Sequence, residues 1–121
     1  MKATNSIKKN AGFVNKFLKK ELKGNPKQLY DAASHLILHG GKRLRPFLVL
    51  KSCQMLGGRQ SDAMAAASAV EMIHNFTLVH DDIMDNDEMR HGVPTTHKKF
   101  DMPLAILAGD VLYSKAYHTI S

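Results

Sequence analysis

Three aspartates near the middle of the sequence have the spacing of a cation site, because Asp81, Asp82 and Asp85 form the pattern DDxxD. In a helix, Asp81 and Asp85 lie one turn apart on the same side, so their charges repel and neither neutralises the other. Carboxylate oxygens suit Mg²⁺, which proteins usually hold with one or two carboxylates together with the phosphates of a substrate. The motif therefore predicts Mg²⁺ at Asp81 and Asp85, with a diphosphate supplying further ligands.

The residues around this motif extend the same helical face. His74 lies seven positions before Asp81, almost two full turns, and so faces the same way. Asp82 is rotated by about 80° from this stripe. It suits either a second metal ion or a hydrogen bond to a ligand of the first metal ion. A solvated acidic helix end is the simpler interpretation, but acidic residues near a helix C-terminus oppose the helix dipole and are unfavourable there without a cation.

A second group of charges lies in GGKRLRP, residues 40–46, between two expected helices. Its glycines let the backbone approach a ligand closely, and Pro46 fixes the direction in which the chain leaves. Lysine offers a compact charge and arginine a planar fork for two phosphate oxygens, so Lys42 and Arg45 together suit a diphosphate without metal. Basic turns are also common on solvated surfaces, and it is the combination with DDxxD that favours an anion site.

The order of three segments carries a family resemblance. GGKRLRP, then HNFTLVHDDIMD at residues 74–85, then RHGVPTTH at residues 90–97 resemble the trans-isoprenyl diphosphate synthases, or polyprenyl synthetases, over nearly the whole chain. The likeness is greatest to the archaeal-type short-chain geranylgeranyl diphosphate synthases. It implies an all-α, isoprenoid synthase-type antiparallel helix bundle that condenses isopentenyl diphosphate with an allylic diphosphate and uses Mg²⁺. Residues 1–121 would form the N-terminal part of such a domain, without the part that carries the second aspartate-rich motif.

This resemblance implies roles for individual residues. Asp81, Asp82 and Asp85 match the catalytic first aspartate-rich motif, in which Asp81 and Asp85 hold Mg²⁺ that bridges to the allylic diphosphate. Arg90 matches an arginine that contacts this same diphosphate. The isopentenyl diphosphate site is implied to comprise Lys42, Arg45, His74 and His91.

His91 departs from the family pattern, in which a second arginine commonly follows Arg90. Histidine keeps a hydrogen-bond donor but carries a charge only part of the time near neutral pH. We therefore expect weaker binding of isopentenyl diphosphate, or a steeper pH dependence of that binding, than an arginine would give.

Phe76 and Thr77, five and four positions before Asp81, lie about one helical turn below the motif. In the family, product length depends on the depth of an apolar tunnel beneath the aspartates. A bulky aromatic at this place resembles the enzymes that stop at twenty carbons, so the sequence indicates geranylgeranyl diphosphate as the product. A plain core aromatic is the alternative, because aromatic residues on helices usually pack in cores.

The composition fits one cytoplasmic globular domain, with 121 residues, 44% hydrophobic content and a net charge of +6. The basic charge gathers in residues 1–27, which hold eight lysines and one acid, Glu21. These lysines alternate with apolar residues at helical spacing, which indicates an amphipathic helix and no nucleic-acid partner. Attraction to an anionic membrane surface stays open. Cys53 is the only cysteine, so no disulfide forms within the chain.

Apolar periodicity predicts about five helices and no convincing strand. The expected helices span residues 5–23, 26–39, 46–56, about 61–85 and from 104 onward. Pro26 suits a helix first turn, Ser61 or Asp62 is the expected N-cap of the fourth helix, and a turn is expected at residues 92–96. The fifth helix is apolar enough to be buried, and the family resemblance implies a dimer interface there.

Several functional accounts stay open from the sequence. The chain is expected to be inactive alone and to work as a homo- or hetero-oligomer with a C-terminal half or a full-length synthase. It would then be a truncated synthase or one half of a split synthase. A non-catalytic regulatory subunit is the alternative outside the enzymes. A terpene cyclase shares DDxxD but has no use for an isopentenyl diphosphate site such as GGKRLRP.

Overall fold

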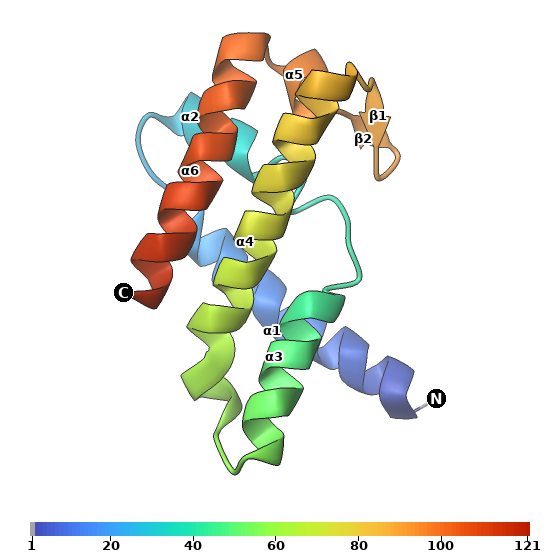
Figure 1. Ribbon diagram of the computed structural model, residues 1–121, viewed down its shortest axis with the longest axis vertical. Coiled ribbons are helices and arrows are strands. Elements are labelled where there is room, and N and C mark those ends of the chain that lie inside the picture. Colours follow the sequence, from blue (N-terminus) through green and yellow to red (C-terminus); the bar gives the residue numbers. More distant parts are fainter. Residues whose placement is uncertain (1) are drawn as a thin grey trace.

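The computed structural model describes residues 2–121, with side chains from residue 5 onward, and the described chain is almost entirely helical (Figure 1). Its helices are α1 (Lys2–Glu21), α2 (Lys27–Ser34), α3 (Leu44–Met55), α4 (Gln60–Asp85), α5 (Thr96–Lys99) and α6 (Met102–Ile120). Two short strands, β1 (Met89–Arg90) and β2 (Val93–Pro94), pair in antiparallel fashion. The predicted all-α class is confirmed.

The long helix α4 is the centre of the fold, with α6 along one side and α3 along the other (Figure 1). Small residues let α4 and α6 approach closely. At Gly109 of α6, an added Cβ atom would lie 2.3 Å from Nε2 of His80 on α4, so a side chain does not fit. Nε2 of His80 also lies 3.2 Å from the carbonyl oxygen of Ile106. This close packing holds α4 in place beneath the candidate site.

Helix α1 packs its apolar stripe inward and its lysines outward, as predicted. Val14, Leu18 and Leu22 are buried at a spacing of four residues, the spacing of one helical face. Phe13 is an exception, with 42% of its surface exposed, because it lies on the flank of that stripe. The helix ends at Glu21, two residues earlier than predicted.

Other helix boundaries also differ from the predictions, most clearly those of α2 and α4. α2 ends at Ser34, and the chain continues in turns to residue 39. These turns still bury Leu36 and Ile37. The predicted helix was too long because it was extended over these two buried apolar residues. Pro26 takes the N-cap position instead of the first turn. α4 begins at Gln60 with Arg59 as its N-cap, so the predicted caps were wrong. Asp62 instead accepts the backbone N–H of Arg59 at 3.4 Å, and Ser61 lies within the helix.

The hairpin after α4 was not predicted. His91 and Gly92 connect β1 to β2 with φ angles of 55° and 77°, which is the backbone form of a tight two-residue hairpin loop. Strands of two residues are too short to show the alternation by which a strand is recognised in a sequence. The hairpin turns the chain back toward α4, so that His91 faces the site.

Helix α6 is buried on only one of its faces. Ala105, Ala108 and Leu112 are fully buried, and Asp101 caps the helix by accepting the backbone N–H of Leu104 at 2.8 Å. The opposite face exposes large apolar side chains at Ile106, Leu107, Tyr113, Tyr117 and Ile120. The predicted burial of this helix is therefore correct for one face. Within residues 2–121, no helix is long and apolar enough to cross a membrane.

Candidate functional site

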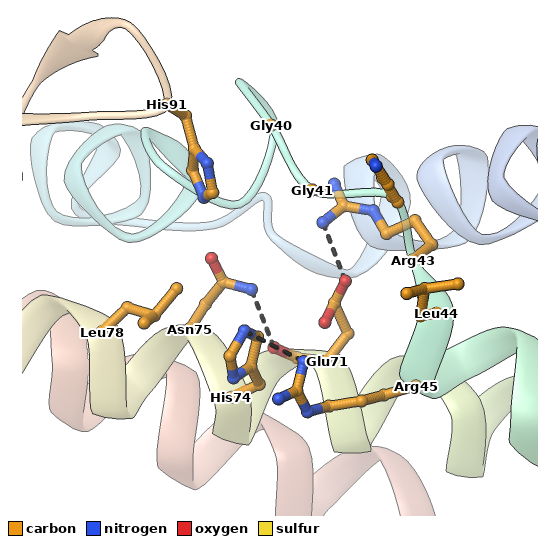
Figure 2. Close-up of a pocket in the computed structure, with 11 residues that line it drawn as sticks. Gly40, Gly41, Arg43, Leu44, Arg45, Glu71, His74, Asn75, Leu78 and His91 are labelled. Atoms are coloured by element: carbon orange, nitrogen blue, oxygen red, sulfur yellow. Dashed lines mark hydrogen bonds and ion pairs between the residues drawn. The ribbon is translucent and has the colours of Figure 1, made fainter.

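Four residues from three separate segments line one pocket of about 220 Å³. Lys42 and Arg45 come from the loop between α2 and α3 and the start of α3, His74 comes from the middle of α4, and His91 comes from the hairpin. Figure 2 shows the His91 ring above the pocket, with Arg45 extended along α4 below it. The structure thus brings together the four residues that the family resemblance implied for isopentenyl diphosphate.

Arg45 and His74 contact each other at the edge of this pocket, with 3.3 Å between Nη1 of Arg45 and Nε2 of His74. Burial lowers the pKa of His74, and the charge of Arg45 lowers it further, with smaller effects from Arg90 and His91 and an opposing effect from Glu71. His74 is therefore neutral at neutral pH, and its unprotonated Nε2 accepts a hydrogen bond from the Arg45 guanidinium. Both groups can still offer their remaining N–H groups to an anion.

The His91 ring packs directly on the backbone of Gly40. A Cβ atom added at Gly40 would lie 2.5 Å from Cγ of His91, so no larger residue fits without displacing the ring. Gly41 has a φ of 95°, a conformation that strongly favours glycine. The sequence indicated that these glycines admit a ligand to the backbone, but at Gly40 the close neighbour is the His91 side chain.

Arg43 points away from solvent, unlike its two basic neighbours. Its side chain is 3% exposed and donates from Nη1 to Oε2 of Glu71 at 3.0 Å and from Nε to Oδ1 of Asn15 at 2.8 Å. Its Nη2 donates to the backbone carbonyl of Ile37. Figure 2 shows this side chain reaching across to Glu71. Of the cations in GGKRLRP, Lys42 and Arg45 are therefore the ones exposed to the pocket and to solvent.

The aspartates of the DDxxD motif divide into two kinds at the end of α4. Asp81 and Asp85 are exposed. Asp82 is 1% exposed and accepts hydrogen bonds from Arg90: Nε lies 2.9 Å from each carboxylate oxygen and Nη2 lies 2.7 Å from Oδ1. The hydrogen bonds that Arg90 donates to Asp82 raise the pKa of Arg90, burial opposes this, and the charges of Asp82, Asp87 and Asp81 raise it further.

Asp81 and Asp85 suit Mg²⁺ because their carboxylates lie one turn apart on one helix and face solvent. Among the side chains that the structure describes, no group of three or more histidine, cysteine or acidic residues is arranged to hold a metal ion. A Mg²⁺ ion on this pair would therefore take its other ligands from water and from diphosphate oxygens, which is common for this ion.

Phe76 and Thr77 leave α4 in different directions from His74. Phe76 is half-buried, with ring centroids 4.7 Å from His80 and 5.2 Å from Tyr113 of α6. Thr77 is exposed, and its hydroxyl donates to the backbone carbonyl of His74 at 2.6 Å. Phe76 thus lies in an aromatic group between α4 and α6, as both a tunnel floor and a core aromatic would.

Comparison with known proteins identifies the family of this chain. Residues 26–121 match the family model for polyprenyl synthetases. The chain belongs to the polyprenyl synthetase family. It is 48% identical over 108 residues to the geranylgeranyl diphosphate synthase of Sulfolobus acidocaldarius, which covers 89% of this chain and 33% of that protein. The predicted resemblance is confirmed.

Solved structures of other polyprenyl synthetases show the same fold. The geranylgeranyl pyrophosphate synthetase of the archaeon Geoglobus acetivorans superimposes with a TM-score of 0.91 at 52% identity, over 95% of this chain and 38% of that one.

The large subunit 1 of a heterodimeric chloroplastic geranylgeranyl pyrophosphate synthase from Arabidopsis thaliana is 48% identical over 98 residues, 79% of this chain and 26% of that protein. This polyprenyl synthetase chain spans about a third of the length of such relatives.

The roles of three residues at this polyprenyl synthetase site were not predicted from the sequence: Arg43, Glu71 and Asn15. Glu71 gave the clearest signal, because it is an acid in a largely apolar stretch of α4, one turn before His74. Arg43 was visible as a cation, but nothing in GGKRLRP tells which of three cations turns inward. Asn15 precedes the matched range and carries no motif, so no signal in the sequence singled it out.

Proposed function

We propose that this chain provides the substrate-anchoring part of a Mg²⁺-dependent prenyltransferase, a transferase that condenses isopentenyl diphosphate with an allylic diphosphate. The main support is the pocket that Lys42, Arg45, His74 and His91 share although they are up to 49 residues apart in sequence. Two cations and two imidazoles around about 220 Å³ suit the oxygens of one diphosphate.

The two substrates would have separate anchors along α4. Isopentenyl diphosphate binds at the pocket, where Lys42 and Arg45 supply charge and His91 supplies a further donor. The allylic diphosphate binds near the end of α4, where Arg90 lies beside Asp82 and where Asp81 and Asp85 would hold Mg²⁺. When bound, Mg²⁺ stabilises negative charge on the departing diphosphate.

The proposed reaction joins the terminal alkene carbon of isopentenyl diphosphate to the allylic carbon. The allylic carbon–oxygen bond breaks, its electron pair leaves with the diphosphate, and a proton is lost from the isopentenyl unit. The released diphosphate accepts that proton, so we assign no side chain of this chain as a general base. The Arg90 guanidinium, held in place by Asp82, would bind the leaving oxygens throughout.

We further propose geranylgeranyl diphosphate as the product, with Phe76 and Thr77 near the end of the growing chain. The names of the related geranylgeranyl diphosphate synthases support this product. Turnover would require the remaining part of the synthase, from a C-terminal half or a full-length copy in a homo- or hetero-oligomer. A cytoplasmic location belongs to the same proposal.

The proposal is tested by incubating the purified chain with Mg²⁺, labelled isopentenyl diphosphate and each allylic primer, alone and with a C-terminal half. We expect products of up to twenty carbons in the combined reaction only. Arg45→Gln should raise the KM for isopentenyl diphosphate about tenfold, because it removes a charged hydrogen bond. Arg59→Gln is the matched control, since Arg59 is an exposed arginine whose side chain pairs with Asp62 instead. Absence of product and of isopentenyl diphosphate binding in every mixture would refute the proposal.

A non-catalytic regulatory subunit is the second candidate. The apolar residues exposed along α6 favour it, because such a face is typical of a surface that another chain covers. The relative from Arabidopsis thaliana is described as one subunit of a heterodimeric synthase. The two candidates differ in Asp81→Asn, which should abolish turnover in a reconstituted split enzyme but leave the effect of a regulatory subunit on an active synthase unchanged.

A further inference from the structure

Arg43 is a buried cation that the proposed reaction does not use. Its side chain is 3% exposed, although Arg43 and its partner Glu71 are both among the residues that line the pocket. Three of its nitrogens each donate to a different segment of the chain: α1 at Asn15, the turns after α2 at Ile37, and α4 at Glu71. Arg43 therefore joins three segments that are otherwise distant in sequence.

The backbone at Arg43 is also unusual. Its φ of 58° and ψ of 37° lie in the left-handed region, which residues other than glycine, asparagine and aspartate seldom adopt. This residue is the N-cap of α3, so its backbone sets the direction in which the helix leaves the loop. In this backbone conformation the side chain donates hydrogen bonds to Asn15, Ile37 and Glu71.

We propose that Arg43, with Asn15 and Glu71, is a positioning residue that holds the loop so that Lys42 and Arg45 both face the diphosphate, and that it is not a phosphate ligand itself. The identity of the diphosphate rests on the proposed function. The placement of the loop does not, because it follows from the contacts of Arg43 alone. A guanidinium that is 3% exposed and already paired with the Glu71 carboxylate is poorly placed to bind an anion as well.

If Arg43 has this role, α1 contributes to the site through Asn15, which helps to hold the loop. Asn15 is the residue of α1 that accepts a hydrogen bond from the Arg43 guanidinium, and it lies outside residues 26–121, the range that matches the family. Loss of Asn15 should let the loop shift although Asn15 lines none of the pocket beside His74. The effect would reach the diphosphate through the loop that Arg43 holds, and Asn15 also lines a separate cavity with Gly41 and Lys42 of that loop.

The test compares Asn15→Leu with Asn5→Leu in the full 121-residue chain. Asn15→Leu removes the acceptor for Nε of Arg43, whereas Asn5 is an exposed asparagine on the same helix with no side-chain partner among the described residues. We expect Asn15→Leu to weaken isopentenyl diphosphate binding about tenfold in calorimetry and Asn5→Leu to leave it unchanged. Asn15→Asp keeps an acceptor and should bind like the parent chain.

Arg43→Lys separates positioning from direct binding. Lysine keeps the charge but lacks the planar fork that reaches three acceptors, so a positioning role predicts weaker binding, while parent-like binding would mean that only the positive charge of Arg43 matters. Parent-like affinity in Arg43→Lys, or in a folded Asn15→Leu, would overturn the proposal. If Asn15→Leu does not fold, Asn15→Ser serves instead, because its side chain is too short to reach Arg43.

The pKa of His74, measured by NMR titration of its ring, is a readout that does not depend on the ligand. Arg45 lowers this pKa, so displacement of the loop in Asn15→Leu should raise it, although the chain stays folded by circular dichroism. If the parent chain binds no isopentenyl diphosphate, the proposed function fails, and this titration still decides the role of Arg43. An unchanged His74 titration in Asn15→Leu would then overturn the positioning role.

Discussion

The same substitution at two adjacent aspartates of the DDxxD motif should change the free energy of unfolding by very different amounts. Asp82→Asn removes the charge from a carboxylate that is 1% exposed and accepts hydrogen bonds of 2.7 to 2.9 Å from Arg90. Breaking a fully buried ion pair costs about 3–5 kcal/mol. The Arg90 side chain is 28% exposed, so water can partly solvate the freed guanidinium, and we expect a loss of about 3 kcal/mol.

Urea denaturation followed by circular dichroism measures this change in the free energy of unfolding. A loss of about 3 kcal/mol should lower the midpoint urea concentration by roughly 1–2 M while the slope of the transition stays the same. The thermal midpoint should fall by roughly 10 °C. Because Arg90 and His91 lie in the hairpin that this pair attaches to α4, binding of the allylic diphosphate should weaken in parallel.

Asp81→Asn is the matched control, with the same chemical change one position earlier. Asp81 is exposed, and its substitution relieves repulsion from Asp85, so the free energy of unfolding should change by less than about 0.5 kcal/mol. Mg²⁺-dependent binding of the allylic diphosphate should nevertheless be lost. Equal stability of the two variants would refute the buried pair between Asp82 and Arg90.

Three further outcomes are expected. Gly40→Ala should weaken isopentenyl diphosphate binding in calorimetry, because its Cβ atom would displace the His91 ring. The control is Gly12→Ala, whose Cβ atom meets nothing within 4 Å. It should leave binding unchanged and stabilise α1 by up to about 1 kcal/mol. Burial lowers the pKa of His35 in the folded chain, so the unfolded chain binds the proton more readily. The contribution of His35 to the free energy of unfolding should be full above about pH 6.5 and should be lost as the pH drops below that value. The urea midpoint of His35→Gln should therefore fall less with decreasing pH than that of the parent chain. In the reconstituted synthase, Phe76→Ala should lengthen the product resolved by carbon number, and an unchanged product would mean that Phe76 only packs against His80 and Tyr113.

The sequence could predict α4 and its site residues because one regular helix relates their positions. His74, Asp81 and Asp85 follow from helical spacing alone, and α4 is continuous from Gln60 to Asp85. The inward turn of Arg43 could not be predicted in this way. It depends on a left-handed backbone and on acceptors from distant segments, and neither leaves a local pattern in GGKRLRP.

The hairpin and the buried pair were missed for a similar reason. A two-residue strand shows no alternation, and His91 takes a positive φ that the sequence signals only weakly, although Gly92 follows it. Asp82 was predicted to bind a second metal ion or to contact a ligand of the first metal ion. In the structure its partner is Arg90. That partner is only eight residues away, but the turn that brings it back is irregular.

The continuity of α4 fixes how far apart the two proposed anion sites lie. His74 and Asp81 are seven residues apart on one uninterrupted helix, which corresponds to about 10 Å along its axis. An insertion or deletion of one residue between them would rotate one anchor by about 100° relative to the other and point it away from its substrate. Substitutions within residues 75–80 should thus be tolerated far more readily than insertions or deletions. Natural variation in the length of the sequence should be confined to the loops at the two ends of α4.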